Sequence, residues 1–253
     1  MSDVAREPVP DHPGISRQLL VDNIDPGGST LLGVRYEAGS ADRTREHSVG
    51  QVILVIEGEL NIDGKVCGPG AGCYAPSETP YSIEAVTEAT AVEFRPAPIV
   101  YGTGLPDSAK AKAWSPTPPA ASGAVGWDLM QGAGPVTSVK DFSYFDIYSM
   151  PESQIAPDMS IQALVNHAED DGQSMLMVRH WPGEVTPAHS HDVEQIVVVL
   201  EGSISQGNRT FVPGTGFFTP EHKKYGLQAG PDGVVRVEWR PSPLRFATDW
   251  VEG

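Results

Sequence analysis

Cysteine is almost absent from this sequence, which has two in 253 residues, Cys67 and Cys73. Two cysteines cannot build a disulfide framework or a cluster of thiolate ligands. We expect both side chains to act as small apolar residues in a core. The chemistry of the protein therefore has to be sought among other residue types.

Basic residues are scarce. Lys and Arg number 17 against 33 Asp and Glu, which gives a formal net charge of −16. A protein this acidic is repelled by the phosphate backbone of nucleic acids and by anionic membrane surfaces. We therefore expect a small-molecule partner and neither a nucleic-acid nor a membrane partner.

Long apolar runs are also missing. The opening residues, MSDVAREPVPDHPG, lack the apolar core of a signal peptide. No apolar run approaches the roughly 20 residues that span a membrane as a helix. These features predict a soluble, cytoplasmic protein.

Long amphipathic helical periodicity is absent as well. Instead, short runs rich in Val and Ile are separated by turns, and the sequence has 27 Gly and 23 Pro. This pattern is typical of many short strands joined by tight turns. An all-β fold is predicted.

The order of these runs repeats along the chain. Gln51 and Gln195 are 144 residues apart. Near the end of the chain the sequence VEWRPSP is similar to VEFRPAP, which lies 145 residues earlier. Self-similarity over such a distance indicates two copies of one β-domain. The spacing of 144 also relates Gly39 to Gly183, His47 to His191, Gly58 to Gly202, Gly70 to Gly214, Pro76 to Pro220 and Tyr81 to Tyr225.

The repeat sets the expected domain boundaries. The first copy is predicted at 14–98 and the second at 150–246, with a linker at 99–149 that is rich in Ala, Pro, Gly and Ser. Aromatic residues are expected to anchor the remaining segments. These are Trp114, Trp127 and Phe142 in the linker and Trp250 in the tail.

The stretch GEVTPAHSHDVEQIVVVLEG, residues 183–202, carries the strongest candidate site. His189 and His191 are two residues apart, so on an extended strand both imidazoles leave from the same face. Gln195 opens the apolar run that follows. Two imidazoles and an amide oxygen can supply about half of the ligands of a divalent transition metal. The alternative is a pair of polar histidines, exposed in a hairpin or satisfied inside the domain.

This stretch resembles the first motif of the cupins, Gly-x5-His-x-His-x3,4-Glu-x6-Gly. Gly183, His189, His191, Gln195 and Gly202 fill it without a gap, with Gln in place of the usual Glu. The resemblance implies two tandem antiparallel cupin (jelly-roll) barrels, with one divalent transition metal (Fe, Mn, Ni, Co or Zn) in the second. It also makes a homodimer plausible.

The second cupin motif, Gly-x5-Pro-x-Gly-x2-His-x3-Asn, is only partly present. Gly214 and Pro220 fit, whereas Tyr225 stands at the position of the metal-binding His and His222 at that of a Gly. The predicted metal ligands are His189, His191, Gln195 and His222. Between His222 and Tyr225 the fourth position stays open.

In the first copy the same comparison places Arg45 at the first histidine of the motif and His47 at the second. A guanidinium is permanently charged and has no lone pair for a metal. The first copy is therefore predicted to be structural, or to bind an anion through Arg45.

An open metal site can polarise a carbonyl group or activate oxygen. We expect a metal-dependent enzyme for a small polar organic molecule, with isomerase or lyase chemistry because cupins with Gln at this position carry out redox-neutral reactions. An Fe(II) dioxygenase is the runner-up, and a non-catalytic binding or sensing protein is the third hypothesis. Residues with candidate catalytic roles are Glu194, His222 and Tyr225.

Overall fold

The computed structural model describes residues 6–22, 28–96, 142–166, 172–242 and 248–250. Every regular element in these ranges is a β-strand, and neighbouring strands are antiparallel. These ranges hold no helix that could cross a membrane. The all-β prediction is confirmed. The chain forms two compact units: described residues up to 96 belong with 142–148 in unit 1, and those from 149 onward form unit 2.

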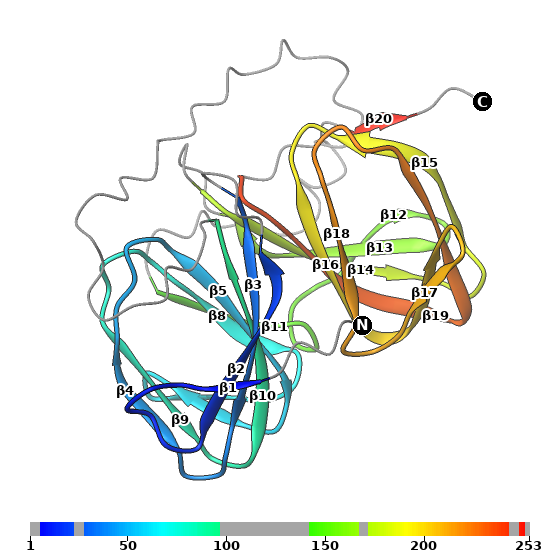
Figure 1. Cartoon of the computed structure of the whole chain (residues 1–253). Helices are drawn as coiled ribbons and strands as arrows, with labels where there is room; N and C mark the ends of the chain where they lie inside the picture. The colour runs from blue at the N-terminus through cyan, green and yellow to red at the C-terminus, as the bar shows by residue number, and fades with distance from the viewer. Residues whose placement is uncertain (1–5, 23–27, 97–141, 167–171, 243–247, 251–253) are drawn as a thin grey trace. The chain divides into compact units, whose positions relative to one another are not determined.

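Unit 1 contains two antiparallel sheets, drawn in blue to green in Figure 1. Its strands are β1 (Glu7–Pro8), β2 (Ile15–Asp22), β3 (Thr30–Tyr36), β4 (Ala41–Arg45), β5 (Gln51–Glu57), β6 (Leu60–Ile62), β7 (Lys65–Cys67), β8 (Ala71–Ala75), β9 (Tyr81–Ala85), β10 (Ala89–Arg95) and β11 (Ser143–Asp146). The larger sheet has the order β1-β2-β3-β10-β5-β8-β11, and the smaller β4-β9-β6-β7.

The interior of unit 1 is built from alternating positions of these strands. Ile53 and Val55 of β5 pack there with Ile83 of β9, and all three are fully buried. Cys67 and Cys73 lie in the same cluster as free, buried thiols. Burial raises the pKa of both thiols. As expected, the cysteines serve as small core residues.

Strand β11 lies inside the segment 99–149 that the sequence suggested as a linker. It pairs with β8 and so extends the larger sheet of unit 1 beyond the predicted boundary. Phe142 packs against Tyr81, with ring centroids 5.6 Å apart. The other two expected anchors, Trp114 and Trp127, lie outside the described residues.

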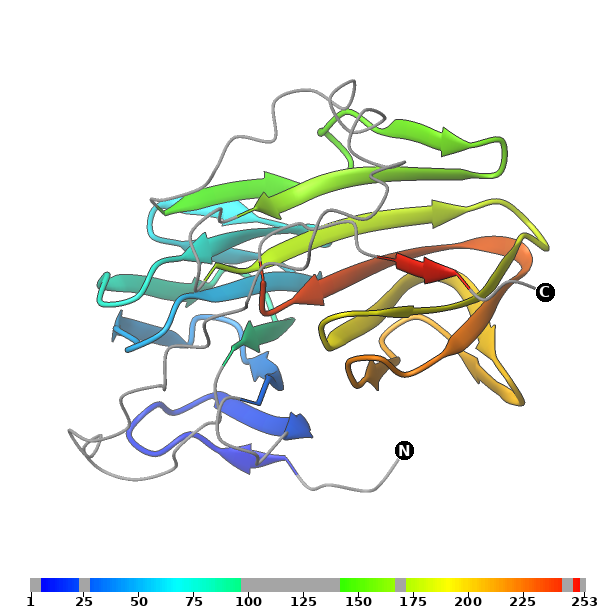
Figure 2. The same ribbon diagram turned by 90° about the horizontal axis from the view of Figure 1, so that it is seen from above.

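Unit 2 has the strands β12 (Ser153–Ala156), β13 (Met159–Asn166), β14 (Ser174–His180), β15 (Val185–His191), β16 (Gln195–Gln206), β17 (Arg209–Phe211), β18 (Gly216–Thr219), β19 (Tyr225–Arg240) and β20 (Thr248–Trp250). They form one sheet in the order β12-β13-β14-β19-β15-β20, and β16 pairs with β17, β18 and β19. Figure 2 shows the green and yellow-green strands β13 and β14 beside the orange-red β19.

The strand pattern of unit 2 follows that of unit 1. β14 pairs with the second half of β19 as β3 pairs with β10, and β15 pairs with the first half as β4 pairs with β9. The single strand β19 thus corresponds to two strands of unit 1. The tail docks on unit 2 because β20 pairs with β15.

The motif glycine Gly202 is required by the backbone. Its φ is +68°, and an added Cβ would lie 2.1 Å from the carbonyl oxygen of Gly233. Gly202→Ala is therefore expected to lower the free energy of unfolding of unit 2 by about 2–3 kcal/mol, which urea denaturation would measure. The control is Gly207→Ala, where φ is +61° but no atom lies within 4 Å, and about 1 kcal/mol is expected. Equal losses would contradict this assignment.

Candidate metal centre

The two motif histidines lie together inside unit 2. β15 is extended, so His189 and His191 project from the same face, with ring centroids 5.0 Å apart. Tyr225 is opposite His189 in the β15–β19 register, and their ring centroids are 4.5 Å apart. All three residues are less than 8% exposed. The structure therefore brings three predicted site residues into one buried cluster.

The orientation of His189 is fixed by its own strand. Its Nδ1 lies 2.8 Å from the carbonyl oxygen of Pro187, which makes Nδ1 the donor and leaves Nε2 as the nitrogen with the lone pair. Burial lowers the pKa of His189 despite this hydrogen bond, and the charges of Arg236 and Arg240 lower it further. The ring is thus held neutral, in the form that ligates metals.

Gln195 completes the cluster at the start of β16. Its side-chain Nε2 donates to the hydroxyl of Tyr225, and its buried Oε1 has no hydrogen-bond partner among the described residues. The first copy repeats this arrangement, since Gln51 donates to Tyr81 and its Oε1 is likewise unsatisfied. The amide–phenol pair is therefore common to both units, and the histidine pair distinguishes unit 2.

His222 and Glu194 lie at the edge of this cluster. His222 is exposed at a turn with φ of 58°, and its backbone N–H donates to the carbonyl oxygen of His191. Among the described residues no three His, Cys, Asp or Glu side chains are grouped as for a metal. The imidazole of His222 is therefore not brought together with those of His189 and His191. Glu194 is half-buried in the turn before β16.

Three buried charged residues of β19 lie next to the cluster and were missed by sequence reasoning. Arg236, Glu238 and Arg240 alternate with apolar residues and are 3%, 7% and 5% exposed. Both guanidiniums donate to Glu238, Arg240 at 3.3 Å. The sequence VVRVEWR shows charged and apolar residues in alternation. On a strand this pattern predicts a charged face, but it does not tell whether that face is exposed to solvent or turned into the domain.

His180 links these charges to Glu184. Its Nδ1 bonds to Glu184, and its Nε2 lies 3.0 Å from NH2 of Arg236. Because Arg236 can only donate, Nε2 accepts and the ring is neutral. Burial and the charge of Arg236 accordingly lower the pKa of His180 from 6.5 to about 3. Burial raises the pKa of Glu184.

Unit 1 fills the equivalent space with an ion-pair network. Arg45 donates to both oxygens of Glu93 at 2.6 and 2.9 Å, and Arg95 donates to the same carboxylate at 3.0 Å. Burial opposes ionisation of Glu93, but the two guanidiniums outweigh it and lower its pKa to about 2. Arg45 also contacts Asp42 at 3.2 Å and the hydroxyl of Tyr36 at 3.2 Å. These contacts favour the structural interpretation of Arg45 over anion binding.

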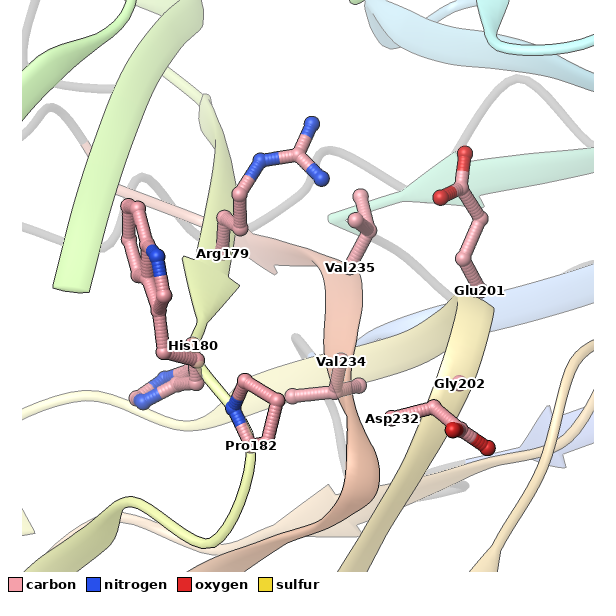
Figure 3. A pocket seen from close by; sticks show the side chains of 9 residues that line it. Arg179, His180, Pro182, Glu201, Gly202, Asp232, Val234 and Val235 are labelled. Atoms are coloured by element: carbon pink, nitrogen blue, oxygen red, sulfur yellow. The ribbon is translucent and has the colours of Figure 1, made fainter. Parts of the chain in front are cut away.

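A hollow of about 370 Å³ lies outside the cluster. Figure 3 shows Arg179 and His180 on one side of it, Glu201 and Asp232 on the other, and Val234 between them. The motif histidines do not line it. Arg179 is occupied by an ion pair with Glu152 at 3.0 Å. The hollow shares His180 with the charge network beside the cluster but is not lined by the predicted metal ligands.

No family model and no curated protein matches this sequence. Solved structures do match its fold. A candidate dioxygenase from Nostoc punctiforme has a TM-score of 0.69 and 13% identity, covering 98% of this chain and 82% of that one. A Bacillus subtilis oxalate decarboxylase variant has a TM-score of 0.66 and 13% identity, covering 99% and 78%.

A third structure, a cupin 2 conserved barrel domain protein from Leptotrichia buccalis, has a TM-score of 0.59 and 14% identity, covering 92% of this chain and 91% of its own. These neighbours match nearly the full length of the chain, and at this identity they establish the architecture alone. The internal repeat, the matching strand order of the two units and these neighbours agree. The chain has the cupin fold, with two such domains in tandem.

Proposed function

We propose that unit 2 is the active domain of a metal-dependent enzyme that acts on a small polar organic molecule by redox-neutral, isomerase- or lyase-type chemistry. The observation that carries this proposal is the buried cluster of His189, His191, Gln195 and Tyr225. Unit 1 has Arg45 at the position of His189 and cannot hold a metal there. Catalysis is accordingly assigned to unit 2.

The cluster fits a divalent transition metal. His189 presents its Nε2 lone pair, and Gln195 has a buried oxygen without a hydrogen-bond partner among the described residues. These atoms and His191 would hold the ion through two nitrogens and one oxygen, a set suited to Fe, Mn, Co, Ni or Zn. A bound ion would act as a Lewis acid toward a substrate oxygen. One neighbour, the oxalate decarboxylase of Bacillus subtilis, is described as having Mn(II) centres.

Tyr225 is the best-placed proton donor. Its hydroxyl oxygen accepts from Gln195, so its own proton is directed away from that amide. Burial raises the pKa of Tyr225, although Arg236 and Arg240 oppose the shift, and the phenol stays protonated at neutral pH. In the proposed reaction Tyr225 hydrogen-bonds a substrate oxygen and orients it. Glu194 stays a candidate base and His222 a candidate ligand by prediction only.

Metal content tests the proposal directly. Protein purified without a histidine tag is expected to carry close to one equivalent of a transition metal by mass spectrometry, and His189→Ala/His191→Ala less than a tenth of that. The matched control is His222→Ala, which removes an exposed imidazole and should retain the metal. Wild type that cannot be loaded would overturn the enzyme proposal and favour the binding or sensing hypothesis. Loss of metal in His222→Ala would instead restore the four-ligand prediction.

The reaction class is separated by two further measurements. Redox-neutral chemistry is expected to show metal-dependent exchange of the proton next to a carbonyl group, followed by NMR in deuterated water with a panel of small carbonyl compounds. A dioxygenase would consume oxygen with Fe(II) and the same panel. The Nostoc punctiforme neighbour is described as a candidate dioxygenase, which keeps this alternative in the test.

A further inference from the structure

Arg240 has hydrogen-bonding capacity that the described residues do not use. Its guanidinium has five N–H donors, and one of them reaches Glu238 at 3.3 Å. Its Nε is buried without a hydrogen-bond partner among the described residues. Asp192 is the other carboxylate whose charge acts on Arg240, and no hydrogen bond joins the two among the described contacts. A buried, under-used guanidinium is a site for an anionic group.

The register places Arg240 at the candidate metal centre. The last pair between β16 and β19 is Ile196 with Trp239, so the next residues outward, Gln195 and Arg240, are neighbours on adjacent strands. Strands of one sheet are about 4.8 Å apart. A ligand held by Arg240 therefore lies within reach of the amide oxygen of Gln195.

Charge balance points to the same ligand. Near the cluster the carboxylates of Glu184, Glu238 and Asp192 act on the guanidiniums of Arg236 and Arg240. These groups leave one net negative charge before a metal binds. A divalent ion held by two imidazoles and an amide oxygen, with no carboxylate among its ligands, turns this into one net positive charge. Buried charge needs a partner, and here the partner has to come with the substrate.

We propose that unit 2 takes an organic anion, a small carboxylate that also carries an oxygen able to reach the metal, and that Arg240 receives the carboxylate group. This inference rests on the proposed function for the metal, and it names the substrate class of the same site. A planar guanidinium matches a carboxylate with paired donors, which a neutral analogue cannot exploit equally. Arg236 already donates to Glu238 and contacts His180, so Arg240 is the guanidinium that we assign to the ligand.

Titration calorimetry with glycolate and its neutral amide, glycolamide, tests the proposal. Mn(II)-loaded wild type is expected to bind glycolate at least about tenfold more tightly than glycolamide. Arg240→Gln should lose about tenfold or more of the glycolate affinity and leave glycolamide unchanged. Arg240→Lys keeps the charge but not the paired donors, and we expect a several-fold loss. This second variant carries the test if Arg240→Gln fails to fold.

Arg209→Gln is the matched control, because Arg209 is exposed on β17 of the same unit. It should bind both probes as wild type does. No preference for glycolate in wild type, wild-type affinity in both Arg240 variants, or an equal loss in Arg209→Gln would overturn the proposal. The comparison is repeated on metal-free protein, where a preference that depends on Arg240 supports the anion site even if no metal can be loaded. Failure of the metal centre and failure of the anion site are thereby distinguished.

Discussion

Glu93→Gln is expected to lower the free energy of unfolding of unit 1 by about 3–5 kcal/mol, the usual effect of breaking a buried ion pair from one side. Glu93 is fully buried and receives hydrogen bonds from Arg45 and Arg95. A neutral amide keeps the size of the side chain but leaves two guanidiniums buried beside each other. Urea denaturation, followed by hydrogen-exchange protection of β5 and β10, measures the loss in unit 1 separately from unit 2.

The matched control is Glu88→Gln. Glu88 pairs with Arg35, but their side chains are 61% and 50% exposed, and such surface pairs contribute less than about 1 kcal/mol. If the two variants lose the same stability, the network around Glu93 is not the buried support that we describe. A loss confined to Glu93→Gln would confirm it.

The two units neutralise an equivalent buried carboxylate with guanidiniums from different positions. Glu93 and Glu238 are equivalent in the repeat, and each buried carboxylate needs a guanidinium. In unit 1 that partner is Arg45, which occupies the first position of the histidine motif. In unit 2 it is Arg236, which lies on β19 together with Glu238, at a position where unit 1 has Ala91. Because Arg236 neutralises the carboxylate, position 189 is available for a histidine.

The repeat made most of the fold predictable. Spacings of 144 and 145 placed equivalent strands correctly, and the agreement extends to the turn after β18. Glu78 and His222 both have positive φ, and both donate a backbone N–H to the carbonyl of the second motif residue at 2.7 Å. Strand β11 was not predictable, because its four residues form a strand only by pairing with β8, far away in sequence.

The site was predictable where local spacing determines geometry. His189 and His191 share a face because a strand has a period of two, and that inference needs no tertiary information. The charged network of β19, formed by Arg236, Glu238 and Arg240, is buried only because other strands cover that face of β19. A single sequence does not reveal which face of a strand is covered. The direction of His222 depends on a turn whose backbone conformation the sequence left open.

Lowering the pH from 6.5 to 4.5 is expected to reduce the free energy of unfolding of unit 1 by up to about 1.4 kcal/mol per pH unit. Burial, with the charges of Arg95 and Arg45, lowers the pKa of His47 from 6.5 to about 3. In this range the unfolded chain binds a proton at His47 and the folded chain does not. The stabilisation is therefore complete above pH 6.5 and is lost as the pH falls toward 3. Below pH 4.5 Glu93, whose folded pKa is about 2, adds a loss of the same sign.

His47→Gln isolates the histidine contribution. NH2 of Arg95 lies 3.4 Å from Nε2 of His47, and a glutamine oxygen can accept in its place without titrating. Urea denaturation at half-unit steps of pH should show a nearly flat response between pH 6.5 and 5.5 in this variant, and a shallower decline than wild type below pH 4.5, where Glu93 contributes but residue 47 does not. If the stability of His47→Gln fell with pH as steeply as that of wild type, the acid sensitivity would belong to another group of unit 1. A glutamine binds no proton in this range and so cannot make the free energy of unfolding depend on pH.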